Sequence, residues 1–155
     1  FYEKLCRSHG ALLFEDYEEV KGWMDWLMDT LDSMERPKCL CHIDANVDNF
    51  LFFEDGSVKL LDWEYAGMCD PVMDVSMCAI YSYYKEEDME RLFRLYLRRE
   101  PSEDELFALY ANAALGGFLW CLWAVYKSIL GDEFGEYTII MYRYAKKYYR
   151  KLRKL

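Results

Sequence analysis

The stretch CHIDANVDNFLFF, residues 41–53, places one histidine, two aspartates and two asparagines between apolar runs. Apolar segments at residues 38–43 and 50–53 have the composition of short strands, and a third such segment follows at residues 57–61. The Asp55-Gly56 pair between the last two segments is typical of a tight β-hairpin. We therefore expect the polar residues of this stretch in a loop between two short strands, with a hairpin after it.

The rest of the chain has the residue pattern of helices. Apolar residues at helical spacing between Asp16 and Met34 predict an amphipathic helix that ends before Arg36-Pro37. After residue 61 the pattern is helical throughout, and the sequence Ser102-x-x-Glu105 predicts a capping box at a helix start. Later helices are expected at residues 70–84, from 86 to just before Pro101, from 102 to about 130, and from about 136 to the end. The predicted fold class is α+β, mainly helical, with no repeat and no domain boundary.

Composition limits the classes of protein to consider. The 155 residues are 54% hydrophobic and 18% aromatic, enough for one folded domain. The six cysteines are scattered, mostly in apolar runs, which indicates buried thiols in a reducing compartment. No signal peptide begins the chain, and the longest apolar run, about residues 118–125, is too short to span a bilayer. We expect a soluble cytoplasmic protein without membrane insertion.

The charge of the chain is unevenly distributed. A net charge of −9 argues against a nucleic-acid binder, although the segment KKYYRKLRKL near the C-terminus is strongly basic. A solvated final helix, whose cations suit a helix C-terminus, accounts for this segment most simply.

Spacing within the quoted stretch points to a chemistry. His42-x-Asp44-x4-Asn49 is the arrangement of the kinase catalytic loop, and Asp62 stands at the end of the next hairpin. Asp44 would accept the proton of an acceptor hydroxyl, and Asn49 and Asp62 would hold Mg²⁺ against the phosphates of ATP. His42 would orient the loop backbone, and a buried core histidine is the simpler alternative. Each residue is ordinary by itself, and only their combination carries the prediction.

A second group of residues is aromatic. Trp120 and Trp123 lie three apart on a predicted helix and therefore share a face. A quaternary ammonium cannot donate a hydrogen bond, so ring faces are the natural way to bind it. From this helix alone, the two tryptophans are better interpreted as part of the buried core. The kinase-like motif between His42 and Asp62 reverses that preference in favour of a cation-binding site. Weaker candidates for the same substrate site are Phe134, Tyr137, Tyr81, Tyr84 and the carboxylate of Glu64, which could instead support the metal.

Two separate segments resemble one known family. The sequence HIDANVDNFLF, followed by VKLLDWEYAGMCDPVMD, resembles the catalytic segment of the aminoglycoside phosphotransferase-like kinases, and among them the choline/ethanolamine kinases, most of all the bacterial choline kinases. FLWCLW at residues 118–123, with Glu133-Phe134-Gly135, resembles the segment in which choline kinases surround trimethylammonium with aromatic rings. The resemblance implies ATP-dependent and Mg²⁺-dependent phosphorylation of the choline hydroxyl.

The chain also departs from that family. Tyr81 stands where eukaryotic choline kinases have an acidic residue, and Ile139 stands near the position of an aromatic one. Ethanolamine, an aminoglycoside or another small amino alcohol therefore remain open as acceptors, as does a non-catalytic kinase-like binding module. Only 41 residues precede His42, without a Gly-rich loop. Residues 1–155 are thus expected to form a kinase-like C-terminal lobe whose partner is a missing N-terminal ATP-clamping lobe, and the fragment alone is expected to be inactive.

Overall fold

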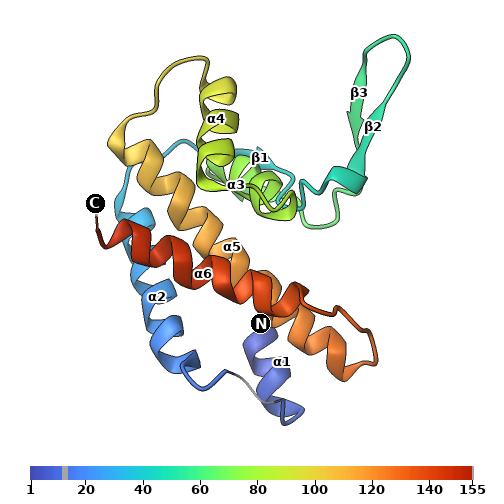
Figure 1. The fold of residues 1–155 in the computed structure, drawn as a ribbon, viewed down its shortest axis with the longest axis vertical. Coiled ribbons are helices and arrows are strands. Elements are labelled where there is room, and N and C mark those ends of the chain that lie inside the picture. Colours follow the sequence, from blue (N-terminus) through green and yellow to red (C-terminus); the bar gives the residue numbers. More distant parts are fainter. Residues whose placement is uncertain (12–13, 155) are drawn as a thin grey trace. The chain divides into compact units, whose positions relative to one another are not determined.

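The computed structural model describes residues 1–11 and 14–154 (Figure 1). It divides into two compact units. The first, which we name the helical unit, consists of Phe1–Met34 and Ala113–Leu155. The second, which we name the hairpin unit, is Glu35–Asn112. Helix α5 (Glu103–Ile129) begins in the hairpin unit and continues into the helical unit.

The helical unit is built from α1 (Tyr2–Ser8), α2 (Tyr17–Ser33), most of α5 and α6 (Tyr137–Leu152). The apolar face of α2 is buried, as its helical spacing predicts. Helices α5 and α6 approach closely at Gly117, where a Cβ would lie 2.7 Å from the carbonyl oxygen of Met141. Only glycine allows this contact without displacement of the α6 backbone.

The hairpin unit contains two separate two-stranded antiparallel sheets and two complete α-helices, in addition to the start of α5. Strand β1 (Cys39–Cys41) pairs with β4 (Gly67–Cys69), and β2 (Phe50–Phe52) pairs with β3 (Val58–Leu60). Helices α3 (Val72–Tyr81) and α4 (Glu86–Leu97) follow, and the 3₁₀ helix η1 (Val47–Asn49) precedes β2. Figure 1 shows β2 and β3 extending as a hairpin away from α3 and α4.

Local signals predicted several elements correctly. Helix α2 begins and ends within one residue of its expected bounds. At the start of α5, Glu105 accepts a hydrogen bond from the backbone N–H of Ser102 (2.8 Å), and Ser102 Oγ accepts one from the N–H of Glu105 (3.3 Å), which confirms the capping box. The Asp-Gly hairpin is also confirmed, with Gly56 at a φ of +81°, where a glycine is favoured.

The expectation that the chain is helical throughout after residue 61 was wrong. Strand β4 forms there and pairs with β1, so the first predicted strand pairs with this segment and not with the hairpin. Helix α1 was also missed, and every predicted strand is shorter than expected. A strand of three residues is too short to show a period, so its partner in the fold decides whether it forms.

Two expectations from composition can be compared with the structure. All six cysteines are free thiols, which confirms the absence of a disulfide framework, and burial raises the pKa of Cys121 to about 12. The run seen in the sequence is only part of helix α5, whose 27 residues are long and apolar enough to cross a membrane by length and composition alone. Since 67% of its most apolar stretch is buried within the structure, α5 has the character of a core helix.

Candidate active site

The backbone that leads from β1 into the polar loop is held by a carboxylate from α3. Asp74 Oδ2 accepts a hydrogen bond from the N–H of His42 (2.9 Å), and Asp74 Oδ1 accepts one from the N–H of Ile43 (2.7 Å). Ile43 has a φ of +69°, a conformation that costs a β-branched residue about 1–3 kcal/mol. Both oxygens of one carboxylate therefore stabilise a strained turn immediately before Asp44.

His42 connects this turn to the end of the hairpin. Its side chain is buried, with 1% of its surface exposed, and its Nε2–H donates to the carbonyl oxygen of Leu61 at 2.6 Å. The imidazole also meets the ring of Trp63 edge-on, with the ring centroids 4.8 Å apart. These contacts support a positioning role for His42, because its ring bridges β1 and the residue just before Asp62.

Asn49 brings its side chain back to Asp44. Its Nδ2 donates to the carbonyl oxygen of Asp44 at 3.0 Å and to the carboxylate oxygen Oδ2 of Asp44 at 3.1 Å. Since the amide nitrogen is used by Asp44, the oxygen Oδ1 is the atom of Asn49 left to contact a ligand. Two of the predicted site residues, five apart in sequence, are thus in direct contact.

The register of the hairpin determines where Asp62 lies. Phe50 pairs with Leu60, and the N–H of Leu61 donates to the carbonyl oxygen of Asn49 at 2.9 Å. Leu61 therefore lies opposite Asn49, and Asp62 follows Leu61 at the open end of the hairpin. It is exposed and has a φ of +60°.

The donor atoms suit a hard cation. A carboxylate at Asp62 and an amide oxygen at Asn49 are ligand types that Mg²⁺ prefers. Among residues 1–11 and 14–154, no group of three or more His, Cys, Asp or Glu could hold a metal ion. A site of this kind would thus depend on oxygens from phosphate and water in addition to the protein, as is usual for Mg²⁺ in nucleotide enzymes.

Four of the predicted aromatic residues form one continuous cluster in the helical unit. The ring centroids of Trp120 and Trp123 are 5.5 Å apart, those of Trp123 and Phe134 are 5.0 Å apart, and those of Phe134 and Tyr137 are 6.2 Å apart. We name these four residues the aromatic cluster. Trp120 is buried, whereas Trp123 is partly exposed and has the ammonium group of Lys127 5.7 Å from its ring centroid. A ring of this cluster already attracts a cation.

The remaining candidates lie in the hairpin unit. Tyr81 ends α3, and Tyr84 contributes to a separate cavity of about 330 Å³ beside α4. Glu64 is exposed in the turn between Asp62 and β4. None of these three belongs to the aromatic cluster as defined above.

Sequence reasoning missed the role of Asp74. The residue was visible as the last acid of DPVMD in the first turn of α3, but no local pattern showed what its carboxylate would contact. Its two partners are 31 and 32 residues away, so only the folded chain identifies them.

Curated relatives include an ethanolamine kinase. The chain is 27% identical over 135 residues to the protein LicA of Haemophilus influenzae, an alignment that covers 83% of this chain and 36% of LicA. It is 26% identical over 151 residues to ethanolamine kinase 1 of Mus musculus, covering 79% of this chain and 42% of that protein. The chain therefore spans well under half of the length of these relatives.

Solved structures show the same likeness. The choline kinase LicA from Streptococcus pneumoniae superposes with a TM-score of 0.82 at 28% identity, covering 97% of this chain and 52% of LicA. A structure of LicA in complex with AMP superposes with a TM-score of 0.79 at 26% identity, covering 97% of this chain and 53% of that one. The sequence pattern of the phosphotransferase enzyme family (APH) matches residues 2–109, more than half of the chain. The chain belongs to the phosphotransferase enzyme family, and it has the kinase-like fold of that family.

Proposed function

We propose that this chain carries the phosphoryl-transfer loop and the acceptor-binding aromatic residues of an ATP-dependent choline kinase. The observation that carries the proposal is the hydrogen bond between the Asn49 amide and Asp44. It joins the proposed base, Asp44, to a proposed metal ligand, Asn49, within one loop. Similarity to the choline kinase LicA and to an ethanolamine kinase supports the same reaction class.

Asp44 orients the acceptor hydroxyl and receives its proton. Asn49, with its amide nitrogen bound to Asp44, presents an oxygen to the metal, and Asp62 presents a carboxylate. Asn49 and Asp62 would hold Mg²⁺, which would supply positive charge to the phosphates of ATP. His42 and Asp74 are positioning residues, because their hydrogen bonds join the loop backbone and the end of the hairpin.

The aromatic cluster binds the trimethylammonium group of choline. Trp123 is the main candidate, because its ring is partly exposed whereas that of Trp120 is buried. Tyr81, Tyr84 and Glu64 belong to the hairpin unit and remain further candidates for acceptor binding. Ethanolamine is the alternative acceptor, favoured by the similarity to an ethanolamine kinase.

Residues 1–155 act in this proposal as the C-terminal lobe of the kinase. The chain covers about half of the length of the LicA structures, which leaves room in such a protein for a lobe that closes over ATP. We expect the isolated chain to bind substrates weakly and to turn them over poorly, because the groups that hold the ATP phosphates from above would be supplied by that lobe.

The first test is nucleotide binding by the 155-residue chain. Calorimetric titration with ADP is compared with and without Mg²⁺ for the wild type, Asp62→Ala and the matched control Glu54→Ala, which removes an exposed carboxylate at the other end of the same hairpin. We expect Mg²⁺-dependent binding in the wild type and the control, and its loss in Asp62→Ala. An equal Mg²⁺ response of Asp62→Ala and the wild type would remove Asp62 from the metal site.

The second test is turnover by the complete protein that contains this chain. Formation of ADP is measured with choline, ethanolamine and an aminoglycoside as acceptors. The proposal expects the highest kcat/KM for choline. Acceptor binding without any acceptor-dependent ADP formation would support the non-catalytic binding module instead.

A further inference from the structure

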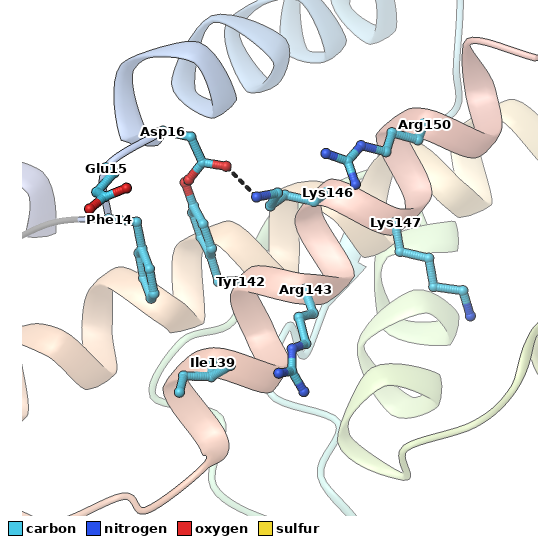
Figure 2. Close-up of a pocket in the computed structure, with 9 residues that line it drawn as sticks. All are labelled: Phe14, Glu15, Asp16, Ile139, Tyr142, Arg143, Lys146, Lys147 and Arg150. Carbon is cyan, nitrogen blue, oxygen red and sulfur yellow. Dashed lines mark hydrogen bonds and ion pairs between the residues drawn. The ribbon is translucent and has the colours of Figure 1, made fainter.

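A cavity of about 790 Å³ lies in the helical unit between residues 14–16 and α6 (Figure 2). Its lining is apolar at one end, where Phe14 and Ile139 stand, and it carries a row of cations along α6: Arg143, Lys146, Lys147 and Arg150. We name this cavity the α6 groove. Its volume is in the range of small-molecule sites in proteins.

Positive charge is concentrated here in an otherwise acidic chain. Residues 137–155 contain seven Lys and Arg and no Asp or Glu, whereas the whole chain has a net charge of −9. Interaction with the helix dipole explains cations only in the last turn, where Arg150 and Lys151 stand. It does not explain Arg143, Lys146 and Lys147, which lie in the middle of α6.

The acidic residues of the α6 groove do not cancel this charge. Asp16 forms an ion pair with Lys146 and accepts a hydrogen bond from the hydroxyl of Tyr142 at 2.8 Å. The hydrogen bond from the ammonium of Lys146 lowers the pKa of Asp16, so this carboxylate stays ionised beside that lysine. Glu15 lies beside Phe14, at the end away from Lys147 and Arg150 in Figure 2.

Two arginines are available on the exposed side of the helix. The guanidinium of Arg150 stands 5.6 Å from the ring centroid of Trp23, which in turn stacks on Tyr149 with centroids 4.6 Å apart. This stacking limits the rotamers of Arg150 and leaves the edge of the guanidinium for a ligand. Arg143, which also lines the α6 groove, is exposed about two turns earlier.

From this arrangement we propose that the α6 groove binds an anion with at least two phosphate groups. Phosphate oxygens match the paired N–H donors of arginine and gain charge-assisted hydrogen bonds. Because the cations are spread along the helix, an extended ligand contacts more of them than a single compact anion does. The phosphates come either from a soluble polyphosphorylated compound or from lipid headgroups presented side by side, and the two sources share this chemistry.

The test uses the 155-residue chain and two probes. Tripolyphosphate is titrated calorimetrically in the absence of Mg²⁺, so that the proposed metal site makes no contribution. Sedimentation with vesicles of phosphatidylcholine, with and without phosphatidic acid, tests the lipid source. The double variant Arg143→Gln/Arg150→Gln is compared with the control Lys4→Gln/Arg91→Gln, which removes the same charge from exposed positions outside the groove.

We expect the groove variant to weaken phosphate binding by at least about tenfold and the control by no more than about twofold. Binding of tripolyphosphate identifies a soluble ligand, and binding only to vesicles with phosphatidic acid identifies a lipid headgroup. Binding of neither probe overturns the proposal, and so does an equal loss in both double variants. Lys147→Gln, at another exposed position, gives an independent reading if the double variant does not fold.

Discussion

The loop that carries Asp44 and Asn49 and the aromatic cluster are held in place by different forces. In the loop, Asp74 and Leu61 fix the backbone and the ring of His42 through hydrogen bonds between residues that are distant in sequence. In the aromatic cluster, rings from α5 and from the start of α6 pack against their neighbours, two of them only three residues apart. Directional polar contacts hold the loop, and contacts between ring surfaces hold the cluster.

This difference predicts different responses to mutation. Loss of one hydrogen-bonding side chain in the loop leaves a buried or strained group without its partner. The loss therefore changes the geometry of the loop more than it changes the packing of the core. Loss of one ring removes a contact surface and leaves the backbone of the loop unaffected. Variants of the two regions should therefore separate turnover from acceptor binding.

The largest effect is expected for Asp44→Asn. In the complete protein this change should lower kcat by about 10²–10⁴-fold, because the amide cannot accept the hydroxyl proton. The fold should be unchanged, as judged by circular dichroism, and choline binding should persist. The exposed residue Asp48 provides the matched control Asp48→Asn, for which we expect the wild-type rate. A fully active Asp44→Asn enzyme would exclude Asp44 from the mechanism.

Trp123→Ala should weaken choline binding by roughly 30-fold, because a desolvated cation–π contact is worth about 2 kcal/mol. Tryptophan fluorescence or NMR shifts of the isolated chain report the titration, for which we expect a dissociation constant of order millimolar in the wild type. Ethanolamine should bind less well, since its primary ammonium is more strongly hydrated.

The control for that experiment is Trp26→Ala, which removes a tryptophan of α2 that lies outside the aromatic cluster. If choline still binds after the loss of Trp123, or if choline and ethanolamine bind equally well, the rings of the aromatic cluster have only a structural role.

Asp74→Asn tests whether the loop before Asp44 can be destabilised without a change in choline binding by the aromatic cluster. An amide presents one acceptor where the carboxylate presents two, so one of the N–H groups of His42 and Ile43 loses its partner. We expect a loss of about 1–3 kcal/mol in the free energy of unfolding and a fall in kcat, with choline affinity within about twofold of wild type. A similar loss of choline affinity and kcat would show that the two regions are coupled.

The smallest effect is expected at the start of α5, for Glu105→Gln. Hydrogen bonds from Arg99 and from Ser102 lower the pKa of Glu105 to about 2, below that of an unfolded glutamate. The carboxylate therefore contributes stability above about pH 4.5, and this contribution is lost as the pH falls toward 2. Glu105→Gln should cost about 1 kcal/mol at pH 7 and much less near pH 2, measured by urea unfolding. Glu103→Gln serves as the control, and a cost independent of pH would contradict this account.

Local sequence was sufficient for the elements whose causes lie within a few residues. The capping box of Ser102 and Glu105, the Asp-Gly hairpin and helix α2 were all predicted correctly, because each depends on neighbours three or four positions away. The kinase-like fold was also predicted, from the spacing between His42 and Asp62 together with the resemblance of two segments to the choline/ethanolamine kinases.

Tertiary structure decided what depends on distant partners. Three contacts join residues that are 19 to 31 positions apart: the pairing of β1 with β4, the hydrogen bond from Ile43 to Asp74 and the hydrogen bond from His42 to Leu61. No local pattern specifies such contacts. The basic residues of α6 were visible in the sequence, but the α6 groove exists only because residues 14–16 fold against them. Asp16 and Lys146 are 130 residues apart, and only the folded chain brings two such charges together.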